Sequence, residues 1–267
     1  MKEDILGKKA NDLDGKSWLR NSVSVWDDIK KSNEERKLKH PAMFPTMMCK
    51  RLIESFSLPG NLILDPFCGS GSTLIAASEL SRPSIGFELS KEFVKIYNQR
   101  LDQFELFSNN QKVEAILYQE NAKNLMTHVK PESVNLVITS PPYWNILNQK
   151  RTADGKDIRH YGNIEGDLGI IDDYERFLDS LLEIYKLVYE TQIPGGYFCV
   201  ILMDIRKRDK FFPFHIDTIT RLERIGYELD DIIIWNRKHE YNNLRPLGYP
   251  SVFRINKIHE FILIFKK

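Results

Sequence analysis

Two kinds of apolar pattern alternate along most of this 267-residue chain. After residue 38, short runs rich in β-branched and aromatic residues are followed by longer stretches with the spacing of amphipathic helices. The short runs predict strands at residues 61–66, 83–88, 113–118, 134–139, 196–203, 229–236 and 259–266, and the longer stretches predict helices at 45–57, 71–81, 91–105, 172–191 and 213–225. This alternation indicates an α/β fold with a single doubly wound sheet of seven mainly parallel strands.

The chain divides unevenly by composition. Residues 1–38 are polar, and we expect them to be an irregular N-terminal segment packed on the body. Residues 39–267 are expected to form one catalytic domain, with loop insertions at 145–170 and 237–257.

Composition excludes several classes of protein. The three cysteines, Cys49, Cys68 and Cys199, are far apart and show neither disulfide nor metal-ligand spacing, which suits a reducing compartment. The six histidines are equally scattered, so no metal site is expected. Neither a signal peptide nor an apolar run long enough to cross a bilayer is apparent. We therefore expect a cytoplasmic protein without a membrane partner.

Basic residues gather in three predicted loops, although the formal net charge is only +1. They are Lys150, Arg151, Lys156 and Arg159 in the first loop, Arg206, Lys207, Arg208 and Lys210 in the second, and Arg237, Lys238, Arg245, Arg254 and Lys257 in the third. Because each loop follows the carboxyl end of a predicted strand, or nearly so, these side chains would form one basic rim suited to nucleic-acid phosphates. The alternative is that surface loops are simply charged.

A small-residue loop, DPFCGSG at residues 65–71, follows one predicted strand and opens a helix. Its glycines would let a ligand approach the backbone and the amides of the helix N-terminus. The loop lacks the lysine of a phosphate-binding P-loop and the full spacing of a dinucleotide-binding loop. Glu88 ends the next strand, and an acidic residue about 20 positions after such a loop is well placed to accept ribose hydroxyls. A tight turn and a solvated glutamate are the alternatives.

A second motif, TSPPYW at residues 139–144, stops the predicted strand 134–139. Two prolines remove two backbone donors and fix two φ angles, which makes a rigid corner with an aromatic ring behind it. Ligands of open parallel sheets bind beyond the carboxyl ends of the strands, so the two motifs are expected to face each other. A buried aromatic turn is the alternative.

Together the two motifs resemble those of the amino-methyltransferases, which transfer a methyl group from S-adenosylmethionine to an exocyclic amine of a nucleic-acid base. The form at residues 139–143 is most similar to the branch that modifies N4 of cytosine in DNA. The resemblance covers nearly the whole chain. It implies a class I, Rossmann-like methyltransferase fold whose final strand inserts antiparallel, S-adenosylmethionine as the cofactor and double-stranded DNA as the partner.

The resemblance also implies the cofactor site. The KHPAMFP segment at residues 39–45 resembles the element that closes over the methionine end of the cofactor in this family. Asp65 is expected near the cofactor's amino group. Asn121 stands where many relatives carry an aspartate against the adenine amine, and its carbonyl oxygen can accept the same hydrogen bond. The implied cofactor-binding residues are His40, Pro41, Phe44, Pro45, Asp65, Phe67, Gly69, Gly71, Glu88 and Asn121.

The implied catalytic residues are Ser140, Pro141, Pro142 and Tyr143. An exocyclic amine is a poor nucleophile because its lone pair is delocalised into the ring. Ser140 Oγ and the Pro141 carbonyl are placed to accept its two N–H bonds and favour the charge that develops on nitrogen. The target base must be flipped out of the duplex, and Tyr143, extended by Trp144, would stack on it.

Serine in place of aspartate in this motif favours cytosine N4 over adenine N6. The chain would act in a restriction-modification or regulatory methylation system, with a cognate restriction endonuclease or a specificity partner as candidate partners. Little chain follows the last strand, so target readout is expected from loops 145–170, 204–213 and 237–257. The missing recognition region leaves an RNA base-amine methyltransferase as an alternative. From another class, a cofactor-binding subunit without activity also stays open.

Overall fold

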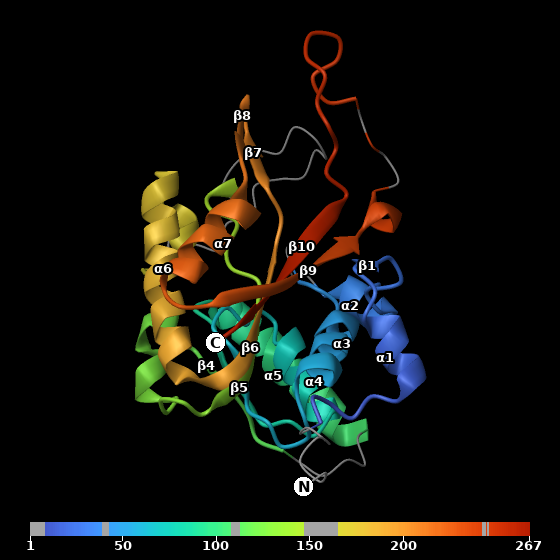
Figure 1. Ribbon diagram of the computed structural model, residues 1–267, viewed down its shortest axis with the longest axis vertical. Coiled ribbons are helices and arrows are strands. Elements are labelled where there is room, and N and C mark those ends of the chain that lie inside the picture. The colour runs from blue at the N-terminus through green and yellow to red at the C-terminus, as the bar shows by residue number, and fades with distance from the viewer. Residues whose placement is uncertain (1–8, 39–42, 108–112, 147–164, 242–243, 245) are drawn as a thin grey trace, which may run out of the picture.

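The computed structural model describes residues 9–38, 43–107, 113–146, 165–241, 244 and 246–267. Its centre is an eight-stranded sheet (Figure 1). In spatial order the strands are β1 (Val25–Trp26), β9 (Glu228–Asn236), β10 (His259–Lys266), β6 (Gln192–Leu202), β5 (Val134–Thr139), β2 (Ile63–Asp65), β3 (Ser84–Phe87) and β4 (Ala115–Tyr118). The predicted fold class, a mainly parallel α/β sheet, is confirmed.

One strand runs against the others. β10 lies between β9 and β6 and is antiparallel to both, with Ile262 opposite Ile201 on one side and Ile233 on the other. The remaining pairs in this sheet are parallel. The inserted antiparallel strand that the resemblance implied is therefore present.

Helices cover both faces of the sheet (Figure 1). Helices α3 (Thr46–Phe56), α4 (Ser72–Glu79) and α5 (Lys91–Phe107) lie on one face, and α6 (Tyr174–Thr191) and α7 (Phe214–Arg224) lie on the other. Successive residues of β6 alternate between the two cores: Cys199 packs with the α3 cluster and Val200 with the α6 cluster. A strand buried on both faces in this way is typical of parallel α/β sheets.

The N-terminal segment is more regular than predicted. It contains α1 (Gly15–Asn21), the short strand β1 and α2 (Asn33–Lys37), and β1 adds an eighth strand by pairing in parallel with β9. The expectations of an irregular segment and of seven strands are therefore wrong. Two-residue strands and helices of five to seven residues are too short to show a periodic apolar pattern. Capping holds α2 instead, through a capping box between Ser32 and Glu35.

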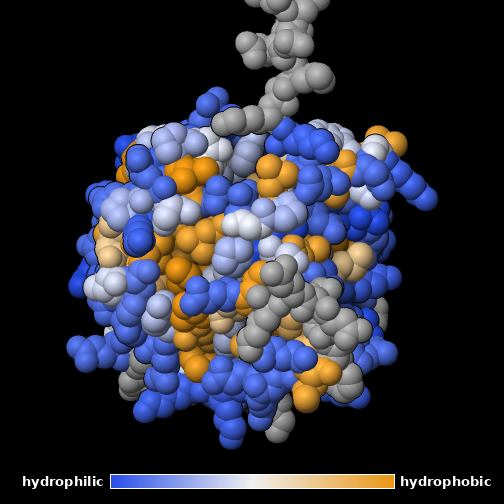
Figure 2. All heavy atoms as spheres, turned by 90° about the horizontal axis from the view of Figure 1, so that it is seen from below, coloured by the Kyte–Doolittle hydropathy of each residue, from blue (hydrophilic) through white to orange (hydrophobic). Residues whose placement is uncertain are grey.

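The remaining elements are the 3₁₀ turns η1 (Ala122–Thr127), η3 (Leu168–Ile170) and η4 (Lys238–Glu240), and a small hairpin of β7 (Ile205–Lys207) and β8 (Lys210–Phe212). The hairpin and the chain before β10 project from the carboxyl edge of the sheet, at the top of Figure 1. The opposite face is mainly hydrophilic, with apolar side chains gathered in patches (Figure 2). Of the predicted insertions, residues 147–164, 242–243 and 245 lie outside the described residues. None of the helices described is long and apolar enough to cross a membrane.

Candidate active site

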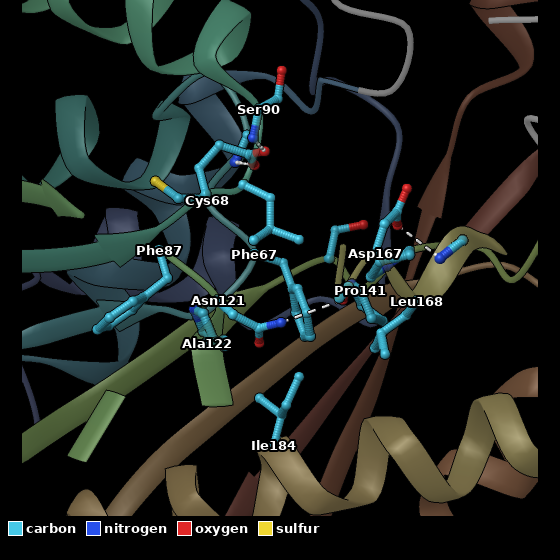
Figure 3. A pocket seen from close by; sticks show the side chains of 18 of the residues that line it. Phe67, Cys68, Phe87, Ser90, Asn121, Ala122, Pro141, Asp167, Leu168 and Ile184 are labelled. Carbon is cyan, nitrogen blue, oxygen red and sulfur yellow. Dashed lines mark hydrogen bonds between the residues drawn. The ribbon is translucent and has the colours of Figure 1, made fainter. Parts of the chain in front are cut away.

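A pocket opens at the carboxyl ends of β2, β3 and β5, where the two sequence motifs meet (Figure 3). The predicted site residues that line it are Phe44, Phe67, Gly69, Glu88, Asn121, Ser140, Pro141, Pro142 and Tyr143. Pro45, Asp65 and Gly71 do not line it. His40 and Pro41 lie outside the described residues. Both motif loops therefore contribute to the same pocket, as expected, and six of the nine residues belong to them: Phe67, Gly69, Ser140, Pro141, Pro142 and Tyr143.

The small-residue loop is shaped by its glycines. Gly69 has a φ of +54° and Gly71 a φ of +79°, conformations in which a side chain is strained. A Cβ on Gly71 would also overlap the ring of Tyr97 on α5. The amide of Cys68 donates to the Phe87 carbonyl at 2.9 Å, which fixes the loop against the end of β3. Gly71 therefore allows α5 to pack on the loop, and Gly69 lines the pocket.

Glu88 joins the loop to the start of α5. Its Oε2 accepts from the Gly69 amide at 2.9 Å, and its Oε1 accepts from the Ser90 amide at 2.7 Å. Burial raises the pKa of Glu88 to about 7, although both amides act to lower it. A carboxylate oxygen has lone pairs beyond these two bonds. The side chain is thus a half-buried acceptor at the pocket wall with capacity for further hydroxyl donors.

Asp65 is fully buried behind the loop. Its carboxylate accepts from the Thr73 hydroxyl at 2.6 Å, the Thr139 hydroxyl at 2.8 Å and the Phe67 amide at 3.1 Å. Burial raises its pKa to about 6. Asp65 therefore connects the small-residue loop, α4 and the residue just before Ser140. Asp65 does not line the pocket, and its place near the cofactor's amino group stays a prediction.

An apolar slot forms one end of the pocket, with side chains from four elements (Figure 3). It consists of Phe67, Phe87, Ala122, Leu168 and Ile184. Sequence reasoning found only the first of these. The others come from strand, turn and helix positions that carry no motif, and a buried apolar residue on its own does not signal a ligand.

Asn121 lies at the edge of this slot, and its hydrogen bonds show why an asparagine suits this position. Its Oδ1 accepts from the Lys123 amide at 2.9 Å, and its Nδ2 donates to the Gly166 carbonyl at 3.4 Å. An aspartate could not make the second bond, because a carboxylate only accepts. The asparagine thus suits the neighbouring carbonyl. A Cβ on Gly166 would overlap this amide nitrogen, so the glycine lets the two segments approach.

Tyr143 is held by a residue of β10, which lies two strands away from β5 in the sheet. Its hydroxyl donates to Glu260 Oε2 at 3.1 Å, and the other carboxylate oxygen of Glu260 accepts from Arg237. Arg237 also pairs with Glu240. Burial, followed by the charge of Glu260, raises the pKa of Tyr143 well above its ordinary value. This chain of contacts was missed from the sequence; its one visible signal is an acidic residue inside the apolar run of β10.

Trp144 does not extend an open stacking face. Its ring is buried, packs edge-on against Tyr174 and Phe212 at 5.2 and 5.0 Å between centroids, and has Lys207 Nζ 4.0 Å from its centre. Its φ of +50° is unusual for a residue with a side chain. Trp144 therefore anchors the Ser-Pro-Pro-Tyr loop in the core, although it also contributes to the pocket lining beside Tyr143.

Two further groups hold the site together: Asp167 lines the pocket, and Arg100 ties together segments behind it. Asp167 caps η3 by accepting from the Gly169 amide at 2.7 Å, and burial raises its pKa. Arg100 of α5 donates to the Ser70 carbonyl at 2.6 Å and to the Thr46 hydroxyl at 2.9 Å, which ties the loop to the start of α3. Neither residue belongs to a recognisable local motif. No group of three or more His, Cys, Asp or Glu suited to a metal occurs within the described part of the chain.

A parallel α/β sheet with an inserted antiparallel strand, and a pocket between a glycine loop and a Ser-Pro-Pro-Tyr corner, defines the class I methyltransferase type of protein. The sequence model of the N6_N4_Mtase family, described as DNA methylase, matches residues 1–99 and 134–267. The chain belongs to this family, which confirms the resemblance to the amino-methyltransferases at the level of the family; the cytosine-N4 branch stays a prediction.

Several known proteins are similar to parts of the chain. The type II methyltransferase M.MthZI of Methanothermobacter thermautotrophicus is 32% identical over 42% of this chain and 36% of its own length. The type II methyltransferase M.BglII of Bacillus subtilis is 34% identical over 38% of this chain and 28% of its own length. Among solved structures, a putative DNA modification methylase from Thermus thermophilus in complex with S-adenosyl-L-methionine is 29% identical over 55% of this chain and 52% of that one, with a TM-score of 0.39. The matches thus span well under two thirds of these relatives.

Proposed function

We propose that this protein transfers the methyl group of S-adenosylmethionine to the exocyclic N4 amine of a flipped-out cytosine in DNA. The observation that carries the proposal is that Glu88, Asn121 and the Ser140–Tyr143 corner line one continuous pocket. Membership of the DNA methylase family and the type II methyltransferases among the relatives support it.

The residues present fit the cofactor. The apolar slot between Phe67 and Ile184 suits an adenine ring, with the Asn121 amide at its edge. Glu88 would accept the ribose hydroxyls, and its raised pKa reflects a carboxylate partly withdrawn from water, which gains from such donors. Phe44 would line the methionine end. When bound, the cofactor supplies an already activated methyl group on its sulfonium.

The chain's own residues would orient the acceptor amine. Ser140 Oγ and the Pro141 carbonyl would accept its two N–H bonds, while the prolines hold both acceptors in a fixed direction. The Tyr143 ring would stack on the flipped base, and its bond to Glu260 keeps the ring in place. A strong base is unnecessary before transfer, because the proton can leave afterwards to Ser140 or to water. Positioning then accounts for most of the rate.

The choice of base rests on Ser140, since serine at this position favours cytosine N4. Two alternatives use the same pocket: an adenine N6 methyltransferase acting on DNA, and an RNA base-amine methyltransferase. The relatives' designation as type II methyltransferases favours DNA and a restriction-modification setting, with a cognate endonuclease as a candidate partner.

The deciding experiment is methyl transfer from labelled S-adenosylmethionine to unmethylated genomic DNA and to total RNA, followed by nucleoside mass spectrometry. N4-methylcytosine from DNA is the expected product. N6-methyladenine would keep the mechanism and overturn the role given to Ser140. Label in RNA alone would replace DNA as the substrate, and cofactor binding without transfer to either would indicate an inactive binding subunit.

A further inference from the structure

Two projections rise from the carboxyl edge of the sheet (Figure 1). One is the β7–β8 hairpin, which follows β6. The other is the segment 246–257 before β10, here called the C-terminal prong. Strands β5, β6 and β9 run in the same direction, so their carboxyl ends lie at the same edge of the sheet. Both projections therefore leave the sheet at the edge where the Ser-Pro-Pro-Tyr corner follows β5.

The projections concentrate positive charge. Residues 204–213 and the C-terminal prong carry Arg206, Lys207, Arg208, Lys210, Arg254 and Lys257 against Asp204 and Asp209, a formal charge of +4 on a chain whose total is +1. Asp204 is already engaged with His215, at 2.5 Å between Oδ1 and Nδ1. Within the described residues, none of the six cations has a carboxylate at ion-pair distance. Their charge is therefore available to a polyanion.

The C-terminal prong also exposes large apolar side chains. Phe253 is 93% exposed, Tyr249 80% and Ile255 73%. Such a cluster on a surface usually marks a binding site. The tip has a defined shape, because the Val252 amide donates to the Gly248 carbonyl at 2.8 Å and Gly248 has a φ of +77°. A Cβ there would overlap the Val252 carbonyl, so only glycine closes this turn.

The two projections contact each other, and the hairpin also contacts the residues that follow the Ser-Pro-Pro-Tyr corner. Lys257 Nζ lies 3.9 Å from the centre of the Phe211 ring, and Arg254 Nη1 donates to the Arg208 carbonyl at 2.5 Å. Lys207 reaches the corner, where its Nζ donates to Asn145 Oδ1 at 3.1 Å and covers Trp144. A partner that binds either projection could therefore displace the residues next to Tyr143, through these contacts.

We propose that the two projections clasp duplex DNA around the target base, with their cations on phosphates and Phe253 inserted into the base stack. This inference rests on the proposed function. Phosphate contacts suit unpaired Arg and Lys side chains at the rim of a base pocket. Apolar wedges unstack base steps, and a flipped base leaves a space that an aromatic ring can fill. A second copy of this chain would carry the same +4 patch, so charge repulsion disfavours it as the occupant.

The charge is tested with Arg208→Gln/Lys210→Gln, which leaves the Lys207 interactions in place. Fluorescence anisotropy on a labelled duplex at several salt concentrations should show binding weakened by about tenfold or more, and a salt slope reduced by about 0.9 for each phosphate that is no longer neutralised. The matched control is Lys130→Gln/Lys186→Gln, two exposed cations away from the pocket. Equal affinity of the two double variants would overturn the proposal.

The wedge is tested with Phe253→Ala against Leu106→Ala, an exposed apolar residue near the end of α5. Phe253→Ala should lower methyl transfer to paired DNA about tenfold, and transfer should recover on a duplex whose target base is mismatched, because a mismatched base is already partly unstacked. No loss, loss without this recovery, or a changed sedimentation coefficient that reveals a dimer contact would each refute the wedge.

These outcomes separate the two proposals. Should the wild-type protein methylate DNA while the projection variants behave like their controls, the clasp fails and the function stands. Should it bind duplex through the projections and transfer no methyl group, the function fails and the clasp stands.

Discussion

The pocket has two walls: the wall around Glu88, proposed to hold the cofactor (the cofactor wall), and the wall around Tyr143, proposed to hold the base (the base wall). The two walls are held in different ways. On the cofactor wall, Glu88 is fixed by backbone amides of Gly69 and Ser90, which lie 19 and 2 residues away in the chain. On the base wall, Tyr143 is fixed by the side chain of Glu260, 117 residues away. The first wall is thus a local structure of one β-α-β segment. The second depends on β10, which lies two strands away from β5 in the sheet, and on the salt bridge between Glu260 and Arg237.

Asp65 prevents the two walls from being fully independent. Its carboxylate bonds to Thr73 at the start of α4 and to Thr139 just before the Ser-Pro-Pro-Tyr corner. A change of the loop can therefore shift Ser140 through one buried carboxylate. The following variants avoid Asp65 for this reason and address each wall separately.

Glu260→Ala should have the largest effect, because it removes one of the two carboxylates that pair with the half-buried Arg237 within the described residues. Removing one partner of a buried ion pair lowers the free energy of unfolding by about 3–5 kcal/mol. Because Arg237 keeps its pair with Glu240, we expect a loss of about 3 kcal/mol here. Urea unfolding measures the loss. Glu240→Ala, at the more exposed end of the same network, should lower the free energy of unfolding by less than about 1 kcal/mol. Equal losses for the two variants would contradict a larger contribution of Glu260 to stability.

Glu88→Ala should weaken S-adenosylmethionine binding by about 1.5–3 kcal/mol for each charged hydrogen bond removed, that is by tenfold or more. Turnover at saturating cofactor should change little, because the base wall is untouched. Isothermal titration calorimetry gives the affinity, and Glu92→Ala, an exposed glutamate on the first turn of α5, is the control. Unchanged affinity would place the ribose contact elsewhere.

The same carboxylate predicts a pH dependence. Its pKa is raised from an ordinary 4.5 to about 7, so the proton stabilises the ligand-free fold below pH 4.5 and this contribution is lost as pH rises through 7. Cofactor binding needs the ionised form and should tighten roughly tenfold between pH 6 and 8. Glu88→Gln should flatten this rise, and its free energy of unfolding should fall less than that of the wild type over the same range. Parallel pH curves for both proteins would contradict the assignment.

Tyr143→Phe should have the smallest effect, since the ring remains and only the bond to Glu260 is removed. A net hydrogen bond is worth about 1 kcal/mol, so turnover should fall several-fold while cofactor affinity stays constant. Tyr143→Ala, which also removes the stacking ring, should lower turnover much further. If Tyr143→Phe altered cofactor affinity as much as turnover, the two walls would not be separable.

Sequence reasoning succeeded where the contacts are local. Phe67, Gly69 and Glu88 belong to one strand-loop-helix-strand segment, and their positions follow from strand ends and small-residue spacing. It failed where a contact is made in space alone. Nothing in the sequence near Glu260 or Arg237 points to Tyr143, and β1 is too short to show a period. Trp144 was misplaced because a loop aromatic can face either the pocket or the core.

The antiparallel strand β10 has a consequence for the order in which the protein becomes competent during synthesis. β10 leaves the ribosome after both strands between which it lies, and it brings Glu260 with it. A nascent chain that has emerged only as far as residue 258 already carries the small-residue loop, Glu88 and Ser140, yet lacks the tether of Tyr143. The cofactor wall can thus mature early, and the base wall waits for the last strand of the sheet.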